Sequence, residues 1–169
     1  MSRGFTIVEL LITVAIIGVI AVTGFGYNFF VDSYDLGRET FLSIYIHNNL
    51  YDKAMIGIDK MVRGAEDHKG LQESQHVDTP VSGASGDTIV FADGEDVSVT
   101  RTIYLSGDDV IYAGGSTETI VDGDVNTLTF SRPSGTNDLI NINIIMQKVS
   151  LGDTITVNLT TSVKLRNVN

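Results

Sequence analysis

The chain has 169 residues, a formal net charge of −10 at pH 7 and no cysteine. This length allows one modest domain with an anchor, and the lack of cysteine excludes disulfides, a thiol nucleophile and any cysteine-based zinc site. The acidic balance argues against a nucleic-acid-binding protein, because such proteins present basic surfaces to phosphates.

A long apolar segment follows the first few residues. The run from Leu10 to Val31 holds no charged residue, and a helix that spans a bilayer needs about 20 residues. Arg3 precedes the run and Asp32 ends it, which favours a cytoplasmic N-terminus and a following domain outside. Glu9 is the exception at the edge of the run. Because an acid in a spanning helix costs roughly 2.5–3.5 kcal/mol on insertion scales, Glu9 is a candidate functional residue.

Two ordinary explanations of this segment have to be weighed. A secretory signal would end in a cleavage site with small residues, and Thr23-Gly24-Phe25-Gly26 is a poor candidate for one. A single-pass anchor, with Glu9 reaching the lipid headgroups, would instead hold a β-rich ligand-binding domain in the cell envelope. This membrane-anchored envelope domain remains the alternative interpretation of the whole chain.

The start of the segment resembles a known processing signal. Arg3 and Gly4 are followed by Phe5, and Glu9 precedes Leu10-Leu11 and an aliphatic run. This order resembles the class III signal of type IV prepilins and type II secretion pseudopilins. The resemblance implies that prepilin peptidase cuts between Gly4 and Phe5 and that Phe5 is then N-methylated. It also implies that Glu9 meets the free terminal amine of a neighbouring subunit.

The chemistry of the implied pair agrees with this arrangement. Cleavage would create an α-amine with a pKa of about 7.7–8.0, which is mostly cationic at neutral pH. Such a charge, brought close in a low dielectric, would compensate a buried Glu9 carboxylate. Gly4 has a steric role, because a peptidase can approach a backbone that bears no side chain.

One long helix is expected from Phe5 to about Lys69, since this part of the chain contains no proline. Beyond the membrane its apolar residues recur in steps of three, four and seven, which predicts one stripe that packs on a core. The predicted stripe consists of Phe41, Ile44, Tyr51, Met55, Ile58, Val62 and Ala65. At about 1.5 Å per residue the helix would be roughly 95 Å long, too long for a globular domain, so its first half must project.

The rest of the chain predicts a loop and then a sheet. Residues 70–86 are polar, contain Pro80 and predict a surface loop. In residues 87–167, short β-branched runs alternate with turn residues, which indicates antiparallel strands. The expected strands are residues 88–92, 97–105, 110–112, 119–121, 127–131, 139–146 and 155–159. Gly152-Asp153 fits a tight connection between the last two strands.

These elements predict an α+β protein with one long N-terminal helix and an antiparallel β-sheet packed on its second half. This resembles the pilin-like arrangement. The expected division is a leader of residues 1–4, a transmembrane and assembly helix of residues 5–31 and an extracytoplasmic domain of residues 32–169. The tail, Thr160–Asn167, resembles the endings of larger minor pilins and J-type minor pseudopilins.

The family resemblance also implies where the chain goes and what it meets. Its partners would be prepilin peptidase and other pilin or pseudopilin subunits, which contact it through their N-terminal helices. It would be held in the inner membrane, with its C-terminal domain outside, and later enter a pilus or pseudopilus. No nucleic acid is expected as a partner, in agreement with the charge.

Catalysis and cofactor binding find little support in the sequence. His47, His68 and His76 fall in no metal or catalytic motif, so we expect neither an enzyme nor a cofactor. Asp122 and Asp124 supply the oxygen ligands that calcium prefers. Acidic residues are also common in hairpin turns, so these two aspartates remain weak calcium candidates. If the thermal stability of the protein is the same in millimolar calcium as in a chelator, these two aspartates are not calcium ligands.

Overall fold

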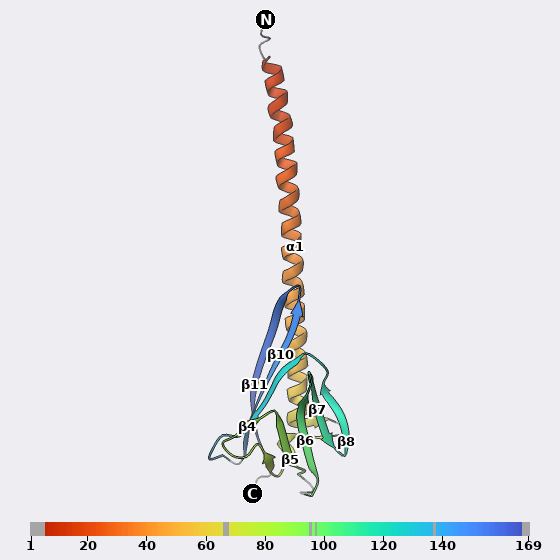
Figure 1. The fold of residues 1–169 in the computed structure, drawn as a ribbon, viewed down its shortest axis with the longest axis vertical. Helices are drawn as coiled ribbons and strands as arrows, with labels where there is room; N and C mark the ends of the chain where they lie inside the picture. Colours follow the sequence, from red (N-terminus) through yellow and green to blue (C-terminus); the bar gives the residue numbers. More distant parts are fainter. Residues whose placement is uncertain (1–5, 66–67, 95, 97, 137, 167–169) are drawn as a thin grey trace. The chain divides into compact units, whose positions relative to one another are not determined.

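The computed structural model describes residues 6–65, 68–94, 96, 98–136 and 138–166 (Figure 1). The chain divides into two compact units, Met1–Leu42 and Ser43–Asn169. A single helix, α1 (Ile7–Arg63), runs through the first unit and into the second. The sheets follow it in the sequence, so the predicted pilin-like α+β arrangement is confirmed.

In the first unit, α1 leaves its apolar side chains uncovered. It contains a window that is long and apolar enough to cross a membrane, and none of that window is buried. The hydroxyls of Thr13, Thr23 and Thr40 each donate to the carbonyl oxygen four residues earlier, at 2.7, 2.8 and 2.8 Å. These hydroxyls are therefore satisfied within the helix itself, which at Thr13 and Thr23, in the apolar run, suits a membrane environment.

In the second unit, one face of α1 is buried, and it is not the predicted face. The buried residues are Ile46, Leu50, Ala54, Gly57 and Met61. The members of the predicted stripe are instead exposed (Phe41, Ile44, Tyr51, Met55 and Ala65) or partly exposed (Ile58 and Val62). Both faces carry apolar residues, but only the buried one carries small residues at its centre, Ala54 and Gly57, which allow the sheet to approach closely.

Gly57 gives a test of this close approach. A Cβ atom added to Gly57 would lie 2.3 Å from Cγ2 of Val121, so something would have to shift. Gly57→Ala is expected to destabilise the domain by about 1–3 kcal/mol, although alanine favours a helix by up to about 1 kcal/mol. Denaturant unfolding of the full chain in detergent measures this difference. At Gly37 a Cβ meets nothing within 4 Å, so Gly37→Ala is the control and should not destabilise.

The helix ends at Arg63, earlier than the predicted end near Lys69. Gly64 has φ 85°, a left-handed conformation that commonly ends helices and suits glycine. The chain then forms a short antiparallel pair between β1 (Gly64–Ala65) and β2 (His68–Lys69).

Two main antiparallel sheets form, where the sequence predicted one. The five-stranded sheet has the order β3-β5-β6-β7-β8. Its strands are β3 (Val77–Thr79), β5 (Thr88–Ala92), β6 (Thr100–Ser106), β7 (Asp109–Gly114) and β8 (Ser116–Val121). The four-stranded sheet has the order β11-β10-β9-β4. Its strands are β4 (Ser85–Gly86), β9 (Val125–Ser131), β10 (Leu139–Ser150) and β11 (Asp153–Lys164).

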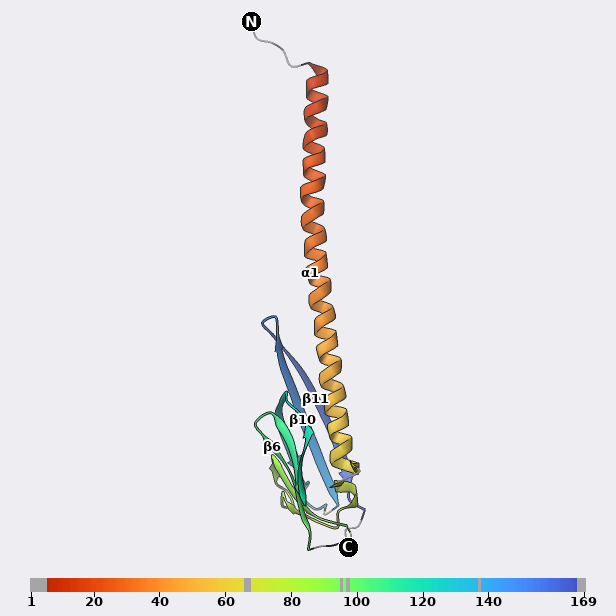
Figure 2. The same ribbon diagram turned by 90° about the vertical axis from the view of Figure 1, so that its right-hand side faces the viewer.

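The two sheets separate at the connection from β8 to β9. Gly123 and Asp124 both have φ 68°, which turns the chain so that β9 pairs with β10 instead of continuing beside β8. Figure 2 shows both sheets on the same side of the C-terminal part of α1. The domain core therefore lies between this helix face and the sheets, and includes Leu50, Met61 and Phe130.

The predicted loop of residues 70–86 also contains regular structure. A 3-10 turn, η1 (Leu71–Glu73), buries Leu71, and β3 and β4 join one sheet each. These strands have only three and two residues, too few to show a periodic pattern. The predicted strand of residues 97–105 begins at Thr100, and Val97 lies outside the described residues.

The β10–β11 hairpin is the longest strand pair. Its register runs from Leu139↔Lys164 to Ser150↔Asp153 without a bulge. Alternate side chains of β10 are fully buried, as the sequence pattern predicted: Ile140, Ile142, Ile144 and Met146. The turn has two left-handed residues, Leu151 with φ 53° and Gly152 with φ 91°. Two such residues are typical of the tight hairpin turns that match the twist of the strands.

Candidate processing and assembly site

The helix α1 begins with a capping box formed by Thr6 and Glu9. Oε2 of Glu9 accepts hydrogen bonds from the backbone N–H and the hydroxyl of Thr6, both at 3.0 Å. In return, Oγ1 of Thr6 accepts a hydrogen bond from the backbone N–H of Glu9 at 3.3 Å. This reciprocal pattern satisfies donors that a helix start would otherwise leave unpaired.

The capping box places the Glu9 carboxylate at the first turn of the helix. The contacts with Thr6 use only Oε2, and Glu9 forms no ion pair with any other described residue. Oε1 is therefore available to a group from another chain. A cut between Gly4 and Phe5, which lie outside the described residues, would keep both Thr6 and Glu9. This capping box was not predicted from the sequence, although the spacing of Thr6 and Glu9 signals it.

The histidines lie apart from one another. His47 is an exposed helix residue, His68 belongs to β2, and Nε2 of His76 is 3.1 Å from Oδ1 of Asp78. Over the described ranges, no group of three or more His, Cys, Asp or Glu side chains could hold a metal ion.

Asp124 is engaged by two lysines, which bears on its candidacy as a calcium ligand. Nζ of Lys53 in α1 donates to Oδ2 of Asp124 at 2.9 Å and to the carbonyl oxygen of Asp122 at 3.0 Å. Nζ of Lys148 in β10 is 3.4 Å from both carboxylate oxygens of Asp124. A calcium ion would have to displace these ammonium groups. The Asp122–Asp124 turn instead joins the helix to the four-stranded sheet.

The charges around Asp124 predict a pH dependence. Burial alone would raise the pKa of Asp124, but the hydrogen bond and charge of Lys53, together with Lys148, lower that pKa below its usual value. A depressed folded-state pKa means that the stabilisation is present above the unfolded-state pKa of about 3.9 and is lost as the pH falls through the folded-state value.

Asp124→Asn is therefore expected to be less stable than the natural chain near neutral pH, and equally stable once the pH lies below the lowered folded-state pKa and the carboxylate is protonated. Thermal unfolding across this pH range measures the difference. Asn tolerates the left-handed backbone at this position, so the substitution tests the charge. Asp122→Asn is the matched control, because Lys53 contacts the backbone carbonyl oxygen of this residue, and its side chain is exposed. A difference between Asp124→Asn and the natural chain that persists at low pH would contradict the assignment.

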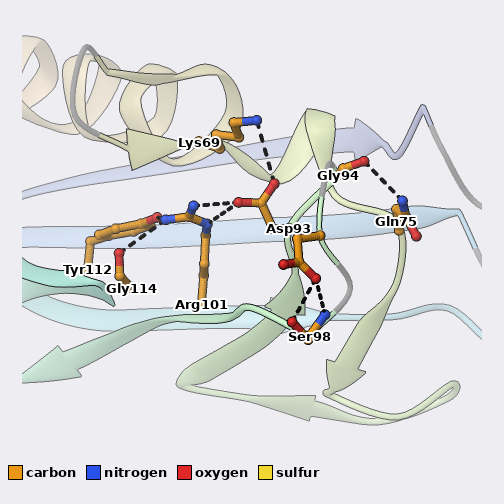
Figure 3. Close-up of polar contacts among 9 residues, drawn as sticks. Lys69, Gln75, Asp93, Gly94, Ser98, Arg101, Tyr112 and Gly114 are labelled. Atoms are coloured by element: carbon orange, nitrogen blue, oxygen red, sulfur yellow. Dashed lines mark hydrogen bonds and ion pairs between the residues drawn. The ribbon is translucent and has the colours of Figure 1, made fainter.

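A polar cluster joins the residue after β5 to β6 and β7 (Figure 3). Nε of Arg101 donates to Oδ2 of Asp93 at 3.1 Å, and Nη1 donates to the hydroxyl of Tyr112 at 2.6 Å and the carbonyl oxygen of Gly114 at 3.1 Å. Nζ of Lys69 is 3.6 Å from Oδ1 of Asp93, a carboxylate that is only 6% exposed. Burial raises the pKa of Tyr112 although Arg101 opposes this, so Tyr112 is a neutral phenol. We interpret the cluster as structural, because Arg101 links neighbouring strands through these contacts.

Removal of Arg101 is expected to destabilise the domain strongly. Arg101→Met would leave the buried Asp93 carboxylate without its main partner, a change that typically costs about 3–5 kcal/mol. Denaturant unfolding in detergent measures the loss. Arg63→Met is the matched control, because Arg63 pairs with Asp59 at 2.9 Å on the surface, where a pair contributes at most about 1 kcal/mol. Equal losses in the two variants would contradict the assignment.

Comparison with known proteins identifies the N-terminal segment. Residues 1–25 match the family model of the prokaryotic N-terminal methylation motif. This range includes Gly4, Phe5 and Glu9 and ends within the apolar helix. No curated protein and no solved structure matches the chain.

The motif and the fold can be considered together. A class III signal at the start of a pilin-like α+β chain is consistent with a type IV pilin or pseudopilin. Such proteins are generally structural subunits without enzymatic activity. The signal implies processing by prepilin peptidase, and the apolar helix that follows it is consistent with a membrane-anchored pilin precursor.

Proposed function

We propose that the chain is a minor structural subunit of a type IV pilus or type II secretion pseudopilus. Prepilin peptidase cuts it after Gly4, and Phe5 is N-methylated. The observation that supports this most strongly is the methylation motif in residues 1–25, placed directly before an uncovered apolar helix. The proposed parts are a leader of residues 1–4, a transmembrane and assembly helix of residues 5–31 and an extracytoplasmic domain of residues 32–169.

The uncovered helix and Glu9 together account for assembly. Before assembly, the membrane surrounds the apolar side chains that the structure leaves exposed. When the subunit leaves the bilayer, these side chains need other apolar helices, so the fibre core is a bundle of such segments. Glu9 then pairs with the terminal amine of a neighbouring subunit, and each charge compensates the other in a low dielectric.

The assignment as a minor subunit rests on the C-terminal tail. Residues Thr160 to Lys164 end the edge strand β11, and Leu165 is buried. The backbone N–H of Leu165 donates to the carbonyl oxygen of Asp138 at 2.8 Å, and that of Arg166 donates to the carbonyl oxygen of Gln72 at 3.2 Å. The tail is therefore an integral part of the domain, and only its resemblance to the endings of minor pilins and pseudopilins supports the assignment of subunit type.

Isolation of surface fibres from producing cells, followed by a pull-down of the chain and identification of its partners, tests this function. The chain is expected in the fibre fraction together with a more abundant pilin or pseudopilin. Recovery in membranes alone, without any pilin-like partner, would contradict the proposal and favour the membrane-anchored envelope domain. The identity of the partners also separates a type IV pilus from type II secretion.

A further inference from the structure

We propose that β11 binds an extended segment of another protein, which adds to the four-stranded sheet as a further strand. The segment has alternating apolar and neutral polar side chains. This inference goes beyond the proposed function, because it names a binding edge on the folded domain that neither processing nor assembly through the N-terminal helix uses.

The outer edge of β11 carries a row of backbone groups that point away from the sheet. β11 lies at the end of the order β11-β10-β9-β4 and pairs with β10 alone. In such a pair, alternate residues bond to the neighbouring strand, and the residues between them face outward. The N–H of Leu165, which donates to the carbonyl oxygen of Asp138 and continues the hairpin register, marks a residue that faces β10. The outward residues are therefore Thr154, Thr156, Asn158, Thr160 and Ser162.

These outward groups are open in the folded domain. Within the described residues, the outward backbone groups from Thr154 to Ser162 form no hydrogen bond. Further along the same edge, the N–H of Arg166 donates to the carbonyl oxygen of Gln72 at 3.2 Å. The edge is thus closed by η1 at its C-terminal end and open before it. Unpaired N–H and C=O groups at the regular spacing of a strand are matched by another extended chain, which defines the kind of occupant.

The other three edge strands of the two main sheets each have a feature that discourages pairing. β3 has three residues and a register shift, and Pro80 follows it, while β4 has two residues. β8 carries Glu118, 3.8 Å from Nζ of Lys60, and its pairing with β7 is also shifted. β11 instead has 12 residues, no bulge, no proline and no charge between Asp153 and Lys164. Proteins normally protect a long edge, so the unprotected edge of β11 favours a role in binding.

The side chains of β11 indicate which segment fits. On the outer face they are uncharged, and Nδ2 of Asn143 in β10 holds two of them in place, donating to Oδ1 of Asn158 at 2.7 Å and to Oγ1 of Thr160 at 2.8 Å. On the opposite face, Ile155 and Leu159 are partly exposed. Side chains of an added strand alternate between these two faces. The segment therefore needs neutral polar side chains on one face and apolar side chains on the other.

The charge of the chain favours another protein over a second copy as the source of this segment. Copies with a net charge of −10 repel one another. The stretch from Thr154 to Val163 carries no charge, so it offers a second copy no attraction that offsets this repulsion. An uncharged segment of a different protein meets no such opposition.

Peptide binding to the full chain in detergent tests this inference. The probe is a dye-labelled Thr-Val-Thr-Val-Thr-Val-Thr peptide, and fluorescence anisotropy measures its binding. The natural chain is expected to bind the probe saturably. Thr156→Pro is expected to bind it about tenfold more weakly or less, because proline removes an outward N–H and its ring obstructs the edge. Absence of saturable binding, or equal binding by the two chains, would overturn the proposal.

Thr156→Val is the matched control. Valine keeps the outward N–H, so this variant should bind the probe like the natural chain. Proline at the same position spares the pairing with β10, because Thr156 and Gln147 face each other without exchanging hydrogen bonds. Denaturant unfolding should therefore show that Thr156→Pro remains folded. Weak binding by Thr156→Val as well would show that the backbone edge is not what the probe recognises and would overturn the proposal.

Hydrogen exchange of the natural chain gives a second test that needs no variant. The probe should slow amide exchange in residues 153–164 and leave residues 116–121 of the edge strand β8 unchanged. Unchanged exchange in β11, or slowing in β8 instead, would overturn the proposal.

The size of the particle in detergent distinguishes the two sources of the segment. The natural chain is expected to be the same size as Thr156→Pro when no probe is present. A natural chain that is a dimer, and that Thr156→Pro converts to a monomer, would overturn the proposed occupant and assign the edge to a second copy.

Discussion

A Gly4→Leu chain is expected to remain in the membrane as an uncleaved precursor. The family motif matches residues 1–25, and the processing junction proposed within it is Gly4-Phe5. A peptidase that approaches the backbone beside Gly4 meets no side chain there, and leucine would fill that space. The expected effect is near-complete loss of cleavage, which the mass of the N-terminal peptide from membrane-extracted protein reports directly.

The matched control is Gly18→Leu. Gly18 lies in the same apolar helix, and a Cβ atom added there meets nothing within 4 Å, so the larger side chain is accommodated. This chain should be cleaved like the natural one. Normal processing of Gly4→Leu, in cells that contain the peptidase, would contradict the assignment of the cleavage site.

A Glu9→Gln chain is expected to be cleaved and held in the membrane but to enter fibres poorly. The neutral side chain cannot compensate the terminal amine of a neighbouring subunit. The loss of one partner from a desolvated charge pair costs about 2 kcal/mol or more, which corresponds to roughly a thirtyfold decrease in incorporation. The amount of the chain in the fibre fraction, relative to that in the membrane, measures the effect.

Comparison with Glu9→Ala separates the charge from the capping box. Glutamine can replace glutamate in a capping box with Thr6, whereas alanine cannot. If the charge matters, both variants should enter fibres poorly. Normal incorporation of Glu9→Gln, with a defect only in Glu9→Ala, would show that Glu9 serves as a helix cap and would refute its role in subunit recognition.

The sequence predicts the strongest features of this fold because their patterns are long. The helix lacks proline and begins with an uninterrupted apolar run, and β10 shows strict alternation from Ile140 to Ile144. Long regular patterns are hard to satisfy with any other structure. The processing junction at Gly4-Phe5 stays a prediction, and it can be made from the sequence because a linear motif needs no folded context.

The buried face of the helix could not be read from the sequence in the same way. Apolar residues occupy two faces of α1 after Leu42, so periodicity alone does not decide which face meets the sheets. The stripe predicted from the sequence has the larger side chains, such as Tyr51, and these dominated the apolar pattern. The structure buries the face with Ala54 and Gly57, since close approach of the sheet needs small residues.

Long-range polar contacts were also beyond the sequence pattern. Arg101 pairs with Asp93 only because β5 and β6 form adjacent strands. A signal was present, since Arg101 lies on the same face of its strand as the buried Ile103, and a charge on a buried face needs a partner. The identity of that partner depends on strand order, which the local sequence does not contain.

Mass spectrometry of the mature N-terminus tests the central claim most directly. The full chain, purified from cells that contain the prepilin-processing machinery, is expected to begin with N-methylated Phe5 and to lack residues 1–4. A mature chain that still begins at Met1 or Ser2 would contradict the account, and Glu9 would then be only the capping residue of an ordinary membrane anchor.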